Sequence, residues 1–282
     1  MTPIVVIARL TVREAIRRKL VAAFLVITAA LVGLSAWGFY RLSHSRSITS
    51  GEVNLALPQA LILFMFMFSF VVALSASAIA SPAVSTELES GVLQTIVTRP
   101  VYRGQVILGK WLGLAALVAG YSVLVTVLEI AVVDAVSGLV PPQPVAVAIY
   151  LFAEGAVLLT LVLLISTRLS TLATGVVGVA LFGAAWLAGV VGALGSSFKI
   201  SGLKTVGAVA RYMLPTDGLW HGVIYSLEPS WFVAQLSSRS AGDQANPFVA
   251  LTPPSWQYLV WAAFWFLLVL GAALLSFERR EL

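Results

Sequence analysis

The chain has no cysteine and very little charge. Without cysteine, disulfides, thiol catalysis and cysteine-ligated metals are excluded. Only 10% of the 282 residues are charged, whereas a soluble domain carries about 25%. The two histidines, His44 and His221, lie in no metal-binding or hydrolase motif. We therefore expect no metal site, no catalytic site and no cofactor bound by this chain.

The chain is rich in apolar residues. They make up 60% of the chain, and the mean hydropathy is +0.99. A globular core could not bury so much apolar surface, so lipid must cover it. The net charge is +5, and the basic residues flank apolar runs. Anionic lipid headgroups explain that charge better than nucleic acid does, so the expected partner is the bilayer.

Six apolar runs are long enough to cross a hydrocarbon core of about 30 Å. They cover residues 20–40, 57–80, 107–133, 145–165, 171–194 and 257–277. No small-residue cleavage site follows the first run, so we interpret it as a retained span and not a signal peptide. The sequence predicts an all-α integral membrane protein with one transmembrane domain over residues 1–282.

The basic residues predict the orientation. Eleven of the 17 lysines and arginines lie in segments 1–19, 82–110, 166–170 and 278–282. Four of the other six lie in segment 195–256, which is too long to count fully in the positive-inside rule. With an even number of spans, this bias places both termini in the cytoplasm and 195–256 outside it.

Residues 1–19 have the pattern of an amphipathic helix. Thr2 can cap it, and Pro3 suits its first turn. Arg9, Arg13 and Arg17 form a stripe at i, i+4 spacing beside an apolar face. The pattern predicts an interfacial basic helix along the cytoplasmic headgroups, whether or not it does more than fix the topology.

Small residues recur every four positions on two of the spans. They are Ala180, Ala184, Ala188, Gly192 and Ser196 on the fifth span, and Ser69, Ala73, Ser77 and Ser81 on the second. Small residues on one face let helices approach closely in lipid. Both spans should pack against protein, within the bundle or across a dimer interface.

The long outer segment 195–256 should contain short amphipathic or re-entrant helices that rest on the outer leaflet. One helix is expected to end at Pro215, and Thr216 can cap the next. Trp220, Trp231, Phe232 and Trp256 suit a headgroup belt. Gating, substrate contact and simple capping of the bundle all remain open for this segment.

Residues 104–110 match the start of a phosphate-binding loop, with Gly104, Gly109 and Lys110 in GxxxxGK. Trp111 stands where a serine or threonine must hold magnesium, and no apolar strand precedes the motif. We therefore expect no nucleotide site here.

The segment 82–106 concentrates charges of both signs between two apolar runs. Thr86 and Glu89 have the spacing of a capping box, which predicts a helix that starts at Thr86. Pro100 biases Arg99 away from helix and ends it. The expected apolar face comprises Leu88, Val92 and Ile96. Such a helix could be a plain interfacial helix or a docking surface.

The residues of this segment resemble the cytoplasmic loop of ABC transporter type-2 permeases. The pattern is Glu-x-x-x-Gly-x-Leu, then Pro-x-x-Arg, then Gly-Lys, formed by Glu87, Gly91, Leu93, Pro100, Arg103, Gly109 and Lys110. The basic first helix, the six spans and the terminal residues 277–282 are also similar to that family. The long last outer loop is most like that of the permease in the copper-related nitrous oxide reductase maturation transporter.

The resemblance implies a coupling helix in the 82–106 loop that sits in a cleft of an ATPase subunit. It implies that the ATPase contact lies at or near Glu87, Glu89, Gly91, Leu93, Arg99, Pro100 and Arg103. Two ATPase chains would bind ATP and Mg²⁺, and two permease copies would pair, with a homodimer expected. The resemblance implies a bacterial-type plasma membrane.

Two acids lie within spans. Glu129 and Glu154 could line a translocation path, as in an ion-coupled secondary transporter, or could be hydrogen-bonded packing groups. They are expected near the outer leaflet and could approach each other. A more remote alternative is a lipid-modifying enzyme with Asp217, His221 and Glu228 as acid/base groups.

Overall fold

The computed structural model describes residues 2–44, 50–89, 102–237 and 246–279, which are mostly helical and contain no strand. Six helices are long and apolar enough to cross a membrane, which confirms the predicted fold class. Those spans are α2 (Lys19–Ser43), α3 (Ser50–Ala80), α6 (Arg103–Ser137), α7 (Pro144–Ser166), α8 (Thr171–Ser197) and α12 (Trp256–Glu278). The shorter helices are α1 (Pro3–Ile16), α4 (Pro82–Glu89), α9 (Ser201–Met213), α10 (Thr216–Leu227) and α11 (Ser230–Ser237).

The helices run past the ends of the apolar stretches that predict them. The third run covers 107–133, whereas α6 has 35 residues, about 52 Å at the usual rise. That length exceeds a hydrocarbon core of about 30 Å, so both ends of α6 reach beyond it. α6 ends where Gly138 adopts a left-handed backbone with φ of +68°.

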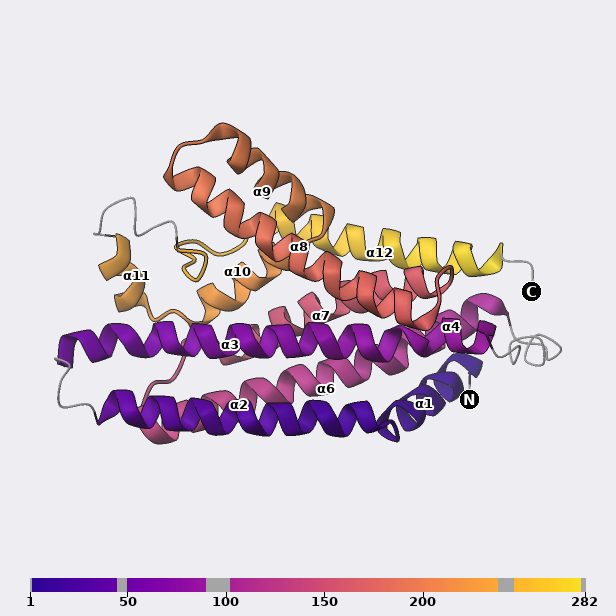
Figure 1. The fold of residues 1–282 in the computed structure, drawn as a ribbon, viewed down its shortest axis with the longest axis horizontal. Coiled ribbons are helices and arrows are strands. Elements are labelled where there is room, and N and C mark those ends of the chain that lie inside the picture. Colours follow the sequence, from indigo (N-terminus) through magenta and orange to yellow (C-terminus); the bar gives the residue numbers. More distant parts are fainter. Residues whose placement is uncertain (1, 45–49, 90–101, 238–245, 280–282) are drawn as a thin grey trace.

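α7 is the central helix of the bundle. It packs against α3, α6, α10 and α12. Its side chains Leu151, Leu158, Leu159 and Val162 are fully buried. α2, α8 and α12 lie at the periphery, where most of their apolar surface is left for lipid. α1, α4 and the C-terminal end of α12 lie at one end of the molecule, and α11 lies at the other (Figure 1).

α1 rests on α6. A Cβ added at Gly109 would lie 2.7 Å from Ile7 Cβ, and one at Gly113 would lie 2.6 Å from the Ala8 carbonyl. The two glycines, four residues apart, let the helices approach closely. Thr2 occupies the N-cap position of α1, but its side chain makes no capping hydrogen bond, so that detail of the prediction was wrong.

Small residues on α3 and α8 pack within the bundle. Gly192 on α8 meets Gly207 on α9, where an added Cβ would lie 2.8 Å from the Gly207 Cα. Ser77 on α3 donates a hydrogen bond to the Gly175 carbonyl at 3.1 Å. Close packing against protein is thus confirmed inside one chain for α3 and for Ala188 and Gly192 of α8, whereas Ala180, Ala184 and Ser196 are exposed.

Within segment 195–256, α10 is more deeply buried than predicted, whereas α9 is mostly exposed. α9 returns alongside α8, and α10 packs mainly against α7. Trp220 is buried and its ring lies 5.4 Å from that of Phe66. Trp220 and the fully buried Phe232 therefore do not belong to a headgroup belt, whereas Trp231 and Trp256 are exposed.

The C-terminal end of α10 lies beside the start of α7. The Gln143 backbone N–H, just before α7, donates to the Ser226 carbonyl at 3.3 Å. The N-cap of α10 is Pro215, so Thr216 begins the helix and does not cap it. α10 thus inserts between α3, α7 and α8, whereas α9 packs on α8 and leaves most of its residues exposed. The position of the two helices relative to the outer leaflet stays a prediction.

Candidate functional site

The segment between α3 and α6 is the candidate site, and its described beginning is α4. α4 starts at Pro82, so the prediction of a helix start at Thr86 was wrong. The Ser81 N–H still bonds to the Ser77 carbonyl at 2.9 Å. A proline is favoured in a first turn, where its missing N–H costs nothing. α4 therefore begins directly after α3, with Thr86 in its interior.

The expected contact residues are only partly within the described ranges. Glu87 and Glu89 lie in the last turn of α4, and Arg103 begins α6. The remaining expected residues lie outside the described part of the chain: Gly91, Leu93, Arg99 and Pro100, together with Val92 and Ile96.

α4 is fastened to the spans around it. Lys110 on α6 is 7% exposed, and its ammonium donates to the Ala83 carbonyl. Thr86 Oγ1 lies 3.2 Å from Thr171 Oγ1 at the start of α8. Val84 is buried in an apolar cluster with Ile107, Leu163, Ala273 and Phe277. A force on α4 would thus act on α6, α7, α8 and α12 together.

The far end of the segment is fastened as well. Arg103 donates to the Glu278 carbonyl at 3.3 Å, which joins the start of α6 to the end of α12. Arg168, after α7, donates to Ser276 at 2.9 Å, and Thr167 shares a hydrogen bond with the same hydroxyl at 2.8 Å. The polar ends of α6, α7 and α12 are therefore tied together at this face.

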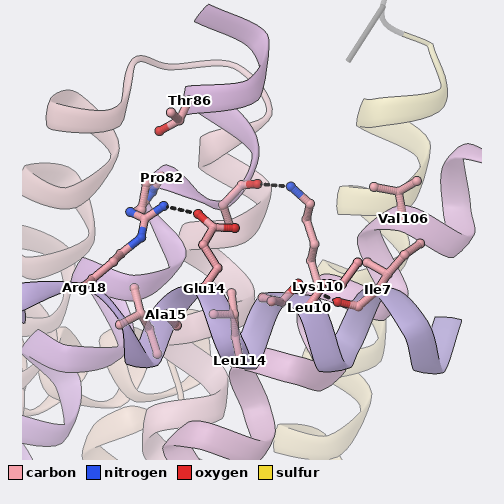
Figure 2. Close-up of a pocket in the computed structure, with 13 residues that line it drawn as sticks. Ile7, Leu10, Glu14, Ala15, Arg18, Pro82, Thr86, Val106, Lys110 and Leu114 are labelled. Atoms are coloured by element: carbon pink, nitrogen blue, oxygen red, sulfur yellow. Dashed lines mark hydrogen bonds and ion pairs between the residues drawn. The ribbon is translucent and has the colours of Figure 1, made fainter. Parts of the chain in front are cut away.

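A cavity of about 280 Å³ opens between α1, α4 and α6. Figure 2 shows Ile7, Leu10 and Leu114 in its apolar lining, with Lys110 reaching across to α4. Glu14 and Arg18 form an ion pair of 2.6 Å at its edge. The basic stripe of Arg9, Arg13 and Arg17 is exposed on α1.

The GxxxxGK match is explained by helix packing. Residues 104–110 all lie in the first turns of α6, so they form no phosphate-cradling loop. Gly109 makes room for α1, and the Lys110 ammonium is bound to α4. The sequence contained the signal for this role, since Gly109 and Gly113 have the spacing of a close helix contact.

The two acids within spans are bound by serines on different helices. Ser35 on α2 donates to Glu129 at 2.7 Å, and Ser69 on α3 donates to Glu154 at 2.8 Å. Glu129 is fully buried and Glu154 is 2% exposed. The structure thus ties Glu129 to α2 and Glu154 to α3. Sequence reasoning missed Ser35, although a serine within an apolar span is itself a sign of a polar contact.

The proposed acid/base trio of the outer segment is not one group. Asp217 pairs with Arg211 at 2.9 Å, and His221 Nδ1 lies 2.9 Å from the Asp217 carbonyl. Glu228 is seven residues beyond His221, about 10 Å along the helix, and accepts from the Ala250 N–H at 3.2 Å. Burial raises the pKa of Glu228 to about 7. Among the described residues, no three His, Asp or Glu side chains could hold a metal ion.

Comparison with known families decides the class of the protein. A family model described as ABC-2 family transporter protein matches residues 5–282. The chain belongs to this family. It is therefore a multi-pass membrane protein and the permease subunit of an ABC transporter, a class that works with an ABC ATPase and is typically dimeric.

No curated protein matches this ABC-2 transporter. The family match covers the whole bundle, including the candidate site, but it does not single out one member. The likeness to the nitrous oxide reductase maturation permease therefore stays a prediction from the sequence.

Proposed function

We propose that this ABC-2 permease is driven by a separate ATPase that docks on the segment 86–103 at the cytoplasmic face. The observation that carries the proposal is the fastening of both described ends of this segment. α4 is held by the Lys110 ammonium and by Thr171, and Arg103 is held by the end of α12. A segment attached in this way can pass rigid-body motion to the spans.

ATP and Mg²⁺ belong to the partner in this proposal. Two ATPase chains would dock beneath two permease copies, one on each segment 86–103. We place the protein in a bacterial-type plasma membrane with both termini in the cytoplasm. The bias of lysine and arginine toward the end that holds α1, α4 and the end of α12 supports this orientation.

Charge reversal tests the docking surface. We expect Glu89→Arg to weaken co-purification of the ATPase with tagged permease by about tenfold, the equivalent of about 1.4 kcal/mol. The permease should still insert into the membrane. Glu52→Arg is the matched control, because it makes the same change near the opposite end of α3. Equal recovery of ATPase with Glu89→Arg and with the control would rule out docking at Glu89.

Ion coupling through Glu129 and Glu154 is the competing mechanism. Each acid has its own serine partner on a different neighbouring helix, which supports a packing role for both. Coupling to an ion gradient would also need no ATPase docking segment. We therefore place the source of energy outside this chain.

A further inference from the structure

The C-terminal end of α9 is capped by aromatic side chains of α12. The last four carbonyls of a helix have no partner within it. In α9, the Ala210 carbonyl accepts from the Leu214 N–H at 2.9 Å. The other three carbonyls accept hydrogen bonds from α12. Tyr258 Oη donates to the Arg211 carbonyl at 3.4 Å, Trp261 Nε1 to the Tyr212 carbonyl at 3.0 Å, and Trp265 Nε1 to the Met213 carbonyl at 2.8 Å. Every one of these carbonyls is thus satisfied.

The three donors share one face of α12, since their spacing is i, i+3 and i+7. They lie two to nine residues after the start of α12, about 3 to 14 Å along its axis. α12 is just long enough to cross the hydrocarbon core, so this depth is in the outer half of the membrane. An unpaired carbonyl is costly there, which makes these bonds specific anchors and not a headgroup belt.

Tyr258 also holds the beginning of α10. Its hydroxyl lies 2.9 Å from the Pro215 carbonyl. The Tyr258 hydroxyl is therefore shared between the carbonyls of Pro215 and Arg211. Its ring lies directly against Gly218, where an added Cβ would be 2.2 Å from the Tyr258 Cζ. α12 therefore contacts both sides of the turn that joins α9 to α10. We call residues 211–218 the outer elbow.

The outer elbow reaches into the centre of the bundle. Asp217 pairs with Arg211 and packs against Gly189 of α8, where a Cβ would lie 2.0 Å from its Oδ1. Leu214 of the elbow is buried in a cluster with Val157 on α7 and Ala185 on α8. A displacement of the elbow would therefore disturb α7 and α8 in the outer half of the bundle.

Polar contacts hold α12 at both of its ends. Its inner end is tied through Ser276 and the Glu278 carbonyl to Arg168 and Arg103. Between the ends, α12 packs against α6 and α7: Ala262 and Val269 are buried, and the Phe266 ring lies 5.2 Å from that of Trp111 on α6. A groove of about 430 Å³ opens beside this contact. Only 22% of its apolar stretch is buried, compared with 56% for α7.

We propose that Tyr258, Trp261 and Trp265 are positioning residues that make α12 and the outer elbow one moving unit, which carries displacement of the cytoplasmic face to the outer half of the bundle. The unit itself follows from the contacts of this chain. Its movement on ATP binding rests on the proposed function above.

The unit is tested on the permease alone, in nanodiscs, by distances between two spin labels. The chain has no cysteine, so Thr205→Cys on α9 and Gln257→Cys on α12 give unique label sites at exposed positions. We expect one narrow distance distribution. Its narrow component should be lost in Tyr258→Phe/Trp261→Phe/Trp265→Phe and kept in Trp256→Phe, a control at an exposed position of the same helix.

Tyr258→Phe alone removes one hydroxyl and keeps the ring. It replaces the triple variant in this measurement if the triple variant does not fold. It should broaden the same distribution by a smaller amount. A distribution as narrow as that of the parent protein in every folded variant would overturn the proposed unit.

Transmission is tested with the co-expressed ATPase, with and without vanadate-trapped nucleotide. Labels at positions 43 and 205 report on the outer half, and labels at 2 and 170 report on the inner face; all four positions are exposed. We expect both distances to shift in the parent protein and only the inner distance to shift in Tyr258→Phe. An outer shift of equal size in Tyr258→Phe would overturn transmission through α12.

If neither distance shifts in the parent protein, the proposed ATP drive is wrong. The experiment on the permease alone still decides whether α12 and the outer elbow form one unit.

Discussion

At the scale of single residues, two buried glutamates bind serines on helices that are far apart in the sequence. Ser69 and Glu154 are 85 residues apart and lie 2.8 Å from each other. Ser35 and Glu129 are 94 residues apart and lie at 2.7 Å. In an apolar environment such bonds select one arrangement of helices, because every alternative leaves a polar group unpaired.

Substitution at Glu154 separates packing from ion coupling. Glu154→Gln keeps an acceptor for Ser69, so we expect little change in thermal stability. Glu154→Leu leaves the Ser69 hydroxyl without this partner and should cost about 1–3 kcal/mol in unfolding free energy. In proteoliposomes under a pH gradient, neither the parent protein nor Glu154→Gln should conduct protons. Proton flux in the parent protein that Glu154→Gln abolishes would show that the ion-coupled mechanism is correct.

Glu228 should make stability depend on pH. Burial raises its pKa from 4.5 to about 7, so the folded state binds more protons than the unfolded state between these values. Its contribution to stability is fully present below pH 4.5 and is lost as pH rises toward 7, with a slope of up to about 1.4 kcal/mol per pH unit. Glu228→Gln should remove this part of the slope in melts at several pH values. A parent protein and variant with parallel pH profiles would show that Glu228 titrates normally.

At the scale of helices, close contacts through glycine fix how α1 sits on the bundle. Gly113→Ala places a methyl group 2.6 Å from the Ala8 carbonyl, so α1 or α6 must shift. Gly120→Ala on the same helix meets nothing within 4 Å and should gain up to about 1 kcal/mol in helix propensity. We expect Gly113→Ala to melt at a lower temperature than the parent protein, and Gly120→Ala to melt at the same or a higher temperature. Equal melting of the two variants would mean that α1 is not packed here.

The long helices could be predicted from the sequence, and the short ones only in part. A run of about 20 apolar residues has few structural solutions in a membrane, so all six spans were found. The start of α4 was missed because the capping-box spacing at Thr86 and Glu89 is a local signal, whereas Pro82 continues a helix that already exists. The burial of α10 was missed because an amphipathic pattern is the same whether its apolar face meets lipid or other helices.

The candidate site, too, could be predicted from the sequence only in part. The resemblance of residues 87–110 to a coupling loop was readable from spacing alone. The bonds from Lys110 to α4 and from Arg103 to α12 join segments 27 and 175 residues apart, and no local pattern encodes such pairs. They depend on how the spans pack, which the apolar sequence of the spans leaves open.

At the scale of the whole molecule, the fold places a fastened segment at one end, and α10 lies between the middle of the molecule and α11 (Figure 1). α12 contacts both, through Arg103 at its C-terminal end and through Tyr258 near its N-terminal end. α7 forms the buried centre against which the other helices pack. This arrangement suits a permease that is moved from one face and must respond at the other.

The most direct test of the central claim is vanadate-sensitive ATP hydrolysis by the ATPase purified together with this permease. Val92→Pro places a proline within the docking segment, where it should break the expected helix. We expect the parent permease to stimulate hydrolysis and Val92→Pro to lose that stimulation by about fivefold or more, with membrane insertion unchanged. Equal stimulation by both proteins, or hydrolysis that ignores the permease altogether, would contradict the account.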